Sequence, residues 1–222
     1  PILYSQLARP YSPGLFFSLL FVLAWTKIVF QDKSESASFT KWNIFLVMGG
    51  VGAMYSHYFS FLFVGIVGLA GFFFINENKK RLFYLISGAC MFLLYVPNFN
   101  VFFTHFSVGG LGGDGGWLGP PGQYAIIEFL FYSFNNDWIL VAYLMAIVFT
   151  ALSLNKFQLD KKKIFFLSII LGLLPVLIAY FYSLFKNPVF QYSILIFGYP
   201  LILIGIASLI DFRNAKYSKL VV

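Results

Sequence analysis

Residues 42–75 read W-N-I-F-L-V-M-G-G-V-G-A-M-Y-S-H-Y-F-S-F-L-F-V-G-I-V-G-L-A-G-F-F-F-I, an apolar run with the polar cluster Y-S-H-Y near its middle. A single helix over this run would be about 51 Å long, because an α-helix rises about 1.5 Å per residue. The hydrocarbon core of a bilayer is only about 30 Å thick. One helix is therefore too long for one crossing. Two helices would each be short, so a re-entrant element remains an alternative.

Basic residues on either side of the run decide between one crossing and two. Lys33 and Lys41 precede it, and residues 79–81 (K-K-R) follow it. Cytoplasmic loops of membrane proteins are enriched in Lys and Arg. One crossing would separate the two basic loops, whereas two crossings place both inside. We therefore predict a helical hairpin whose tip, residues 55–58, lies on the external face.

The composition indicates a membrane protein. Of the 222 residues, 60% are hydrophobic and only 10% are charged, whereas a soluble domain carries about 25% charged residues. The apolar segments lack the alternation of membrane β-barrels, so helices are predicted. We expect an all-α polytopic membrane protein with about seven transmembrane helices, at residues 13–30, 42–56, 58–75, 82–98, 137–154, 164–185 and 192–210.

The predicted topology sorts the cations. Only Arg9 and Lys186 fall outside, and every other Lys and Arg falls inside. The net charge of +7 is thus mostly a topology signal, and no nucleic-acid partner is expected. We interpret residues 1–222 as a single transmembrane domain. Because the chain starts with proline and has no signal peptide, we expect it to be the C-terminal portion of a longer membrane protein.

The predicted external side carries the distinctive residues. Arg9 has a rigid guanidinium fork that suits a phosphate, although an arginine that reaches the lipid headgroups is the alternative. Lys186 offers a second positive charge to the same phosphate, or is an exposed loop lysine. His57 could bond a sugar hydroxyl as a neutral ring, shuttle a proton, or contact phosphate as a cation. The alternatives are a histidine bonded to a neighbouring helix and a histidine at the membrane interface.

A long external loop is predicted over residues 99–136. Its glycine-rich part lacks the G-K-[ST] ending of a nucleotide-binding loop. Within it, Asp114 could accept hydrogen bonds from sugar hydroxyls, and Trp117 could stack on a sugar ring. A solvated carboxylate and a membrane-interface anchor are the respective alternatives. Residues 123–136 favour a helix on the membrane surface. No metal site is expected, because His57 and His105 are the only histidines and no carboxylates cluster with them.

Four motifs in order give the chain a resemblance to a known family. They are S-Q-L-A-R-P-Y, Y-S-H-Y-F, W-L-G-P-P and N-P-V-F-Q-Y-S-I-L-I-F-G-Y-P, between about residues 5 and 205. The set resembles bacterial GT-C glycosyltransferases of the branch related to protein O-mannosyltransferases and aminoarabinose transferases. Each motif alone is weak, and the ordered set on one predicted face is more specific.

The resemblance implies an integral enzyme of the bacterial inner (plasma) membrane. Such an enzyme moves a sugar, with inversion, from a polyprenyl-phosphate donor to a lipid, protein or glycan acceptor on the outer face, and the lipid tail lies between helices. By the matching motifs, Arg9 would contact the carrier phosphate. Tyr55, His57 and Tyr58 of the hairpin tip would line the donor or acceptor pocket. Tyr11, Gln191 and Tyr192, on the same predicted external face, are further candidate substrate-binding residues.

The chain also departs from the family pattern. The family's catalytic aspartate follows its first helix, a region that would precede Pro1, so this chain alone is expected to lack it. Gln191 and Tyr192 stand where family members often have an Arg-Tyr pair. No cofactor is expected beyond the lipid-linked sugar itself. Two other functions stay open: a transporter or flippase of lipid-linked sugars, which would favour charged residues within the spans, and an O-antigen polymerase or ligase.

Overall fold

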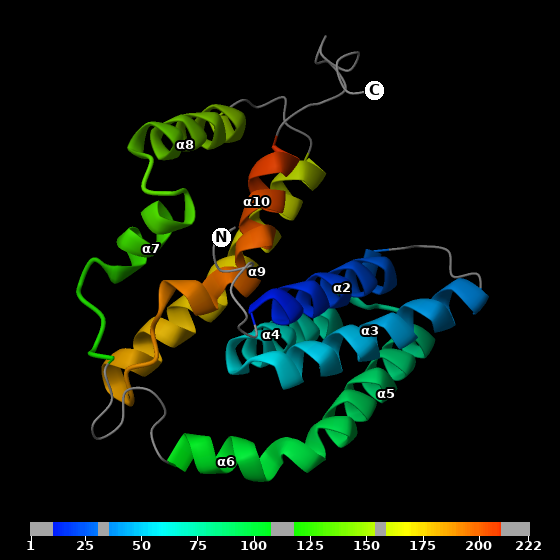
Figure 1. The fold of residues 1–222 in the computed structure, drawn as a ribbon. Coiled ribbons are helices and arrows are strands. Elements are labelled where there is room, and N and C mark those ends of the chain that lie inside the picture. Colours follow the sequence, from blue (N-terminus) through cyan, green and yellow to red (C-terminus); the bar gives the residue numbers. More distant parts are fainter. Residues whose placement is uncertain (1–10, 31–35, 108–117, 154–158, 210–222) are drawn as a thin grey trace.

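The structure, a computed structural model, describes residues 11–30, 36–107, 118–153 and 159–209 (Figure 1). Within these ranges the chain forms helices and no strand. The prediction of an all-α fold is therefore confirmed for the described part. In chain order the helices are α2 (Tyr11–Phe30), α3 (Ser36–Ser56), α4 (Tyr58–Phe74), α5 (Asn78–Tyr95), η1 (Val96–Asn98), α6 (Phe99–Ser107), α7 (Ala125–Ser133), α8 (Trp138–Ser153), α9 (Leu159–Phe185), η3 (Tyr192–Phe197) and α10 (Tyr199–Ser208).

The run at residues 42–75 divides into two helices at His57, as its length and flanking charges predict. His57 has extended backbone angles (φ −162°, ψ 145°) and is the N-cap of α4. Its ring Nδ1 accepts a hydrogen bond from the Phe59 backbone N–H at 3.1 Å, which satisfies one of the free N–H groups that begin a helix. The Ser60 hydroxyl lies 2.6 Å from the Ala53 carbonyl oxygen and so binds the end of α3 to the start of α4.

The first helix of this hairpin is longer than the sequence suggested. The apolar stretch predicted a helix over residues 42–56, but α3 begins at Ser36 and has 21 residues. The polar residues that precede Trp42 continue the helix instead of forming a loop. α3 is nevertheless not one of the described helices that are long and apolar enough to cross a membrane, so a re-entrant element remains an alternative for this hairpin.

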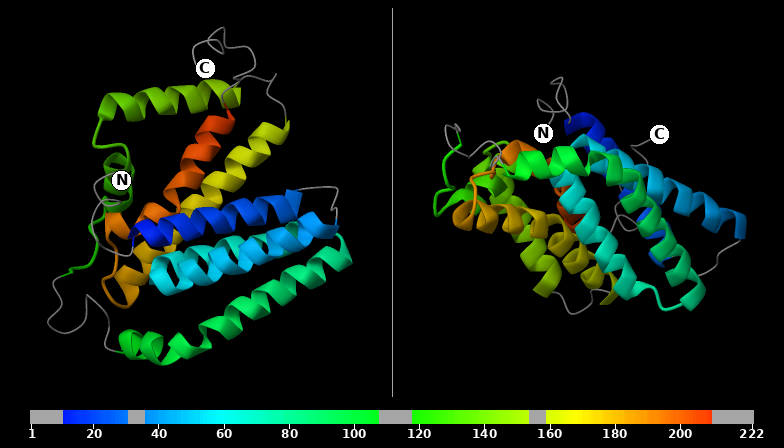
Figure 2. Two further views of the ribbon diagram at one scale, coloured as in Figure 1. Left: turned by 45° about the vertical axis from the view of Figure 1, so that its right-hand side comes forward. Right: turned by 90° about the horizontal axis from the view of Figure 1, so that it is seen from below.

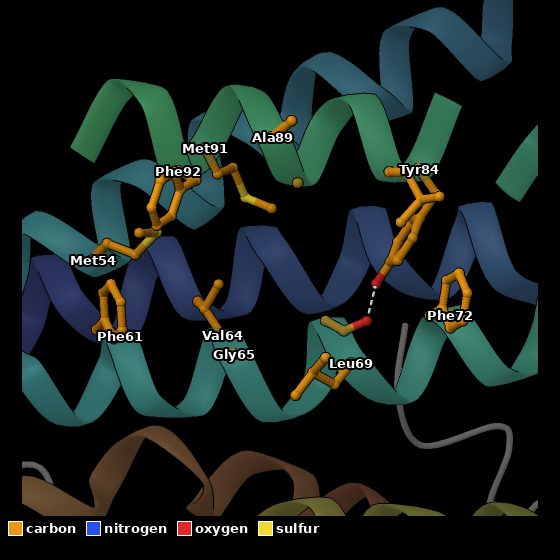
Figure 3. A pocket seen from close by; sticks show the side chains of 13 residues that line it. Met54, Phe61, Val64, Gly65, Leu69, Phe72, Tyr84, Ala89, Met91 and Phe92 are labelled. Carbon is orange, nitrogen blue, oxygen red and sulfur yellow. Dashed lines mark hydrogen bonds between the residues drawn. The ribbon is translucent and has the colours of Figure 1, made fainter. Parts of the chain in front are cut away.

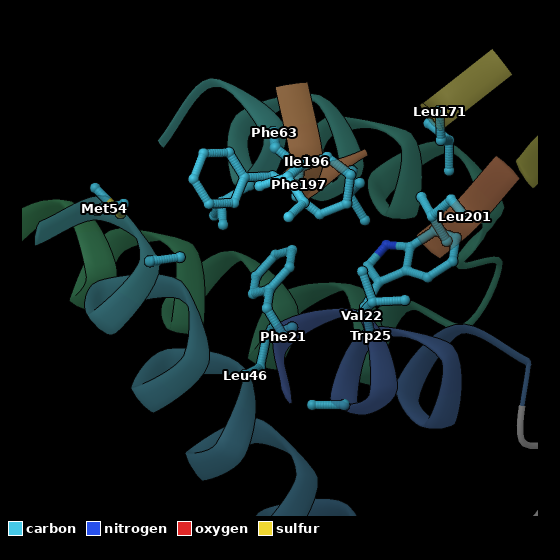
Figure 4. Packing of buried hydrophobic residues seen from close by; sticks show 14 of the residues in the cluster. Phe21, Val22, Trp25, Leu46, Met54, Phe63, Leu171, Ile196, Phe197 and Leu201 are labelled. Atoms are coloured by element: carbon cyan, nitrogen blue, oxygen red, sulfur yellow. The ribbon is translucent and has the colours of Figure 1, made fainter. Parts of the chain in front are cut away.

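Close helix packing holds the N-terminal bundle together. A Cβ atom on Gly49 of α3 would lie 2.6 Å from the backbone nitrogen of Phe21 in α2, so only a glycine lets the two backbones approach this closely. Fully buried Phe21 and Leu46 fill the space beside this contact (Figure 4). Small residues at helix contacts are the usual means of packing in a bilayer, where lipid tails are as apolar as the side chains.

The predicted external loop contains more helix than expected. Residues 99–107 form α6, which continues α5 through the short helix η1. The prediction of one loop over residues 99–136 is thus wrong at its start. The reason is the aromatic spacing of Phe99, Phe102, Phe103 and Phe106, which places the rings on one helical face. Residues 125–133 form α7, inside the segment where a surface helix was predicted.

The C-terminal helices form a second pair beside this bundle (Figure 2). α9 and α10 pack together through glycines, since a Cβ atom on Gly172 would lie 2.9 Å from the Gly198 carbonyl oxygen. A chain reversal with the 3-10 helix η3 connects them. α8 lies to one side (Figure 1), and its apolar side chains are largely exposed, with Phe149 at 75%.

One end of the molecule gathers helix ends that are far apart in sequence. His57 at the α3–α4 turn lies beside Tyr11 at the start of α2, and Phe106 near the end of α6 contacts Tyr182 near the end of α9. The opposite end of the N-terminal bundle joins the end of α2 to the end of α4 and the start of α3 to the start of α5. Its aromatic pairs are Phe30–Phe74 and Phe39–Phe83.

Three helices of the described chain are long and apolar enough to cross a membrane. They are Tyr11–Phe30, the continuous Asn78–Ser107 and Lys161–Phe185, and shorter apolar helices cover Tyr58–Phe74, Trp138–Phe149 and Tyr199–Ser208. By length and composition, these helices indicate a helical membrane protein. The lysine-rich starts of α5 and α9 and Lys27 in the last turn of α2 lie at helix ends away from His57.

Candidate functional site

Two of the sequence-predicted site residues meet at the end that carries His57. The ring centroids of His57 and Tyr11 are 5.7 Å apart, and those of His57 and Phe197 are 5.6 Å apart. The Ser193 hydroxyl lies 3.4 Å from the Tyr11 hydroxyl, at the long limit of a hydrogen bond. We call Tyr11, His57, Ser193 and Phe197 the tip cluster. Gly14 makes room for it, because a Cβ atom there would lie 2.8 Å from the Phe197 ring.

His57 is a neutral ring with one hydrogen-bond donor left. Burial lowers the pKa of His57 from 6.5 to about 4, because removing the imidazolium from water is unfavourable. Since Nδ1 accepts the bond from Phe59, the proton of the neutral ring resides on Nε2. His57 can therefore offer an Nε2–H donor to an oxygen atom, and it does not supply a positive charge near pH 7.

The two tyrosines beside His57 point to other partners. The Tyr55 hydroxyl donates to the Leu94 carbonyl oxygen at 2.8 Å and so joins the tip to α5. The Tyr58 hydroxyl bonds His105 Nδ1 at 2.6 Å and joins α4 to α6. Both tyrosines are partly exposed. Their hydroxyl groups therefore bond α5 and α6, and neither tyrosine belongs to the tip cluster.

A second group of polar residues surrounds a cavity between α7 and η3. The cavity has a volume of about 320 Å³. The Tyr192 hydroxyl donates to Glu128 Oε2 across it at 2.7 Å. Burial first, and then the bond to Glu128 and its charge, raise the pKa of Tyr192 to about 12, so this phenol stays protonated. The cavity is lined by Leu118, Pro121, Gly122, Ala125, Glu128, Tyr132, Phe190, Gln191, Tyr192 and Ser193.

Ser193 connects the two groups, since it lines this cavity and contacts Tyr11 of the tip cluster. Gln191 belongs to the cavity as well, and its side-chain Nε2 is buried without an acceptor among the described residues. The last predicted motif thus contributes to both groups. Aromatic rings hold Tyr192 in place, with the ring of Tyr132 5.2 Å away.

The remaining predicted site residues do not join these groups in the described structure. Lys186 is exposed just after α9, and its backbone N–H bonds the Tyr182 carbonyl oxygen. Its ammonium makes no ion pair within the described ranges. Arg9, Asp114 and Trp117 lie outside the described residues.

An apolar cavity of about 620 Å³ lies between α4 and α5 (Figure 3). Glycines widen it, because a Cβ atom on Gly65 or Gly88 would have nothing within 4 Å. The Tyr84 hydroxyl closes one part by donating to the Gly68 carbonyl oxygen at 2.6 Å. Its lining is otherwise methionine, phenylalanine and aliphatic side chains. Such a space within the apolar part of the bundle suits a hydrocarbon chain.

Sequence reasoning missed three residues of these groups: Glu128, Ser193 and Phe197. Ser193 and Phe197 were inside a motif whose spacing alone gave them no role. Glu128 is the one acidic residue of the segment 123–136, and an isolated carboxylate in a strongly apolar helix is a signal that could have identified it. Its partner Tyr192 is 64 residues away, which no local pattern reveals.

No protein-family model, curated protein or solved structure matches the chain.

Proposed function

We propose that the protein is a membrane glycosyltransferase that moves a sugar from a polyprenyl-phosphate donor to an acceptor on the outer face of the bacterial inner membrane. One observation carries the proposal, namely that segments of the four resembling motifs lie together. Tyr11 and Ser193 are in contact although 182 residues separate them. His57 joins them, and Leu118 and Pro121 of the third motif line the cavity that Ser193 shares.

The chemistry of the tip cluster fits one of the two needs of such a transfer. The acceptor oxygen attacks the anomeric carbon while the bond to the phosphate oxygen breaks, and the bonding electrons leave with polyprenyl phosphate. Donors must therefore stabilise the developing charge on phosphate. His57 Nε2–H and the predicted fork of Arg9 would serve there. The proton of the acceptor hydroxyl needs a base, for which the resemblance implies an aspartate preceding Pro1.

The apolar cavity between α4 and α5 supports the same proposal. A polyprenyl carrier has a long hydrocarbon chain that must lie somewhere within the bilayer while its phosphate reaches the surface. The cavity contains Met54 and Phe61, which lie near the α3–α4 turn, so its outer part lies on the side of His57. It could hold a segment of that chain between two helices.

The test uses the full-length protein in proteoliposomes, with radiolabelled polyprenyl-phosphate mannose and polyprenyl-phosphate aminoarabinose as donors. Membranes of the source organism supply the acceptor. Loss of label from the donor lipid, with release of free polyprenyl phosphate, reports transfer. A flippase would leave the sugar on its carrier, so this readout separates the two functions.

Arg9→Ala and His57→Ala are expected to lower transfer by about 100-fold or more, the usual effect of removing a donor to a developing negative charge. Lys79→Ala is the matched control, because it removes an exposed cation at the far end of the bundle and should leave transfer unchanged. Wild-type transfer rates in both Arg9→Ala and His57→Ala, or no donor consumption by the wild-type protein, would overturn the proposal.

A further inference from the structure

The described residues that line the cavity between α7 and η3 include one charged side chain, and its charge is negative. Glu128 is a carboxylate whose pair with Tyr192 leaves its second oxygen without a hydrogen bond among the described residues. No lysine or arginine occurs among the described residues that line the cavity. Among the described lining residues, a phosphate or other anion would therefore meet the negative charge of Glu128 and no compensating cation. The cavity suits a neutral or positively charged ligand.

The polar groups of this cavity are also of the kind that binds a ligand with several hydroxyls. A carboxylate accepts hydrogen bonds from hydroxyl groups, and such charge-assisted bonds are stronger than neutral ones. Gln191 is partly exposed, and its buried Nε2 has no hydrogen-bond acceptor among the described residues and thus an N–H group to donate. The Tyr132 and Tyr192 rings, whose centroids are 5.2 Å apart, supply flat apolar surface. The volume of about 320 Å³ is at the lower end of the ~300–1,000 Å³ typical of small-molecule sites.

We infer that the cavity between α7 and η3 is a pyranose-binding subsite in which Glu128 accepts, and Gln191 donates, hydrogen bonds to ring hydroxyl groups. Tyr192 is a positioning residue, because its hydroxyl holds one carboxylate oxygen of Glu128. The inference rests on the proposed function for its ligand class. It separates the roles of the two groups, with the sugar in this cavity and the phosphate on the side of Arg9 and His57.

The test is direct binding to the purified full-length protein, measured by saturation-transfer difference NMR with two soluble probes. Methyl glucopyranoside is the neutral probe, and methyl glucuronide is the anionic probe of similar shape. The wild-type protein is expected to bind the neutral glycoside at least about tenfold more tightly than the glucuronide, because a like charge beside Glu128 disfavours the anion.

Glu128→Gln keeps the shape of the side chain and removes its charge. It is expected to weaken binding of the neutral glycoside by about tenfold or more and to abolish the discrimination against the glucuronide. A residue with only a structural role would not change this charge preference. Glu77→Gln is the matched control, since it removes an exposed carboxylate that pairs with Lys80 at the start of α5. It should behave as the wild type does.

Three results would overturn the inference: no glycoside binding by the wild-type protein, equal binding of both probes, or an unchanged charge preference in Glu128→Gln. The transfer assay with Arg9 and His57 variants judges the proposed function separately. Transfer without glycoside binding would refute only the subsite, and Glu128-dependent binding without transfer would refute only the glycosyltransferase. Competition by the neutral glycoside against the lipid-linked donor, or instead against the acceptor, tells which sugar the subsite holds.

Discussion

At the scale of single residues, His57 has two roles that constrain each other. Its Nδ1 caps α4 by accepting from Phe59, and its ring packs between Tyr11 and Phe197. The cap fixes the tautomer, and the packing removes the ring from water. Together they leave the Nε2–H as the group available to a substrate. A residue chosen only for capping would more commonly be Ser, Asp or Asn, so the imidazole is an unusual choice at this position.

The buried neutral ring predicts a specific pH dependence of stability. The folded-state pKa of His57 is about 4 against 6.5 for an ordinary histidine, so between these values the unfolded chain binds a proton that the folded chain does not. This contribution to the free energy of unfolding is complete above pH 6.5. It is lost as the pH falls towards 4, by about 3 kcal/mol at most. Thermal unfolding of the detergent-solubilised protein between pH 7.5 and 4 measures it.

The matched variant for this measurement is His57→Asn, because asparagine is a good N-cap residue and does not titrate in this range. The wild-type protein is expected to lose more stability on acidification than His57→Asn does. The variant should also lose most transfer activity, since the shorter amide does not place a donor where Nε2–H lies. Equal pH slopes for the two proteins would show that the His57 ring is not held neutral by burial.

At the scale of helices, glycines decide which pairs touch. The α2–α3 contact depends on Gly49, whose added Cβ would lie 2.6 Å from the Phe21 nitrogen and 2.9 Å from its Cα. Because both are backbone atoms of a helix, no side chain can rotate away. Gly65 of α4 is different, because an added Cβ would have nothing within 4 Å. These two positions form a matched pair of glycines within one bundle.

Gly49→Ala is therefore expected to destabilise the protein by about 1–3 kcal/mol, the usual cost of overpacking, despite the higher helix propensity of alanine. Gly65→Ala should leave stability unchanged or raise it by about 0.4–1 kcal/mol. Unfolding by heat or by SDS in mixed micelles compares both with the wild type. A Gly49→Ala protein as stable as Gly65→Ala would contradict the close contact between α2 and α3.

The helices also show how far the sequence could be interpreted. Length and flanking charge predict the break at His57, because both depend on the thickness of the bilayer and on charge placement. The start of α3 at Ser36 is not predicted, because the first residues of the helix are polar and lack the apolar pattern of a membrane helix. The helix α6 is not predicted, although Phe99, Phe102, Phe103 and Phe106 have helical spacing, because the predicted span ends at residue 98 and the predicted loop begins directly after it.

The candidate site was harder to predict than the helices. Sequence motifs identified Tyr11 and His57 but could not tell that they meet while Tyr55 and Tyr58 bond α5 and α6 instead. Which of these side chains meet depends on the direction in which the chain turns at His57. Tertiary packing sets that direction, and no local sequence pattern records it. Glu128 and Tyr192 meet only because α7 packs beside η3, and neither segment has a local pattern that requires it.

At the scale of the whole molecule, the arrangement depends on sidedness. The tip cluster and the α7–η3 cavity lie at the end of the bundle where α2 and α4 begin and where α6 and α9 end. The lysine-rich starts of α5 and α9 both lie at the other end of the bundle, away from the tip cluster. If Lys and Arg mark the cytoplasm, both groups face the outside. A lipid-linked sugar exposed on the outer face could then reach both groups from one compartment.

Sidedness can be tested by labelling single cysteines in intact cells with a membrane-impermeant maleimide. Cys90 is exposed on α5, so Cys90→Ser provides the background. In the Cys90→Ser background, Tyr58→Cys should react from outside, because Tyr58 is at a partly exposed position of the tip. Lys79→Cys should react only after the membrane is permeabilised. Lys186→Cys should behave as Tyr58→Cys does, because α9 ends on the same side as the tip. If Tyr58→Cys reacted only after permeabilisation while Lys79→Cys reacted in intact cells, the tip cluster would face the cytoplasm. The proposed transfer on the outer face would then be impossible, even though every contact within the cluster would remain.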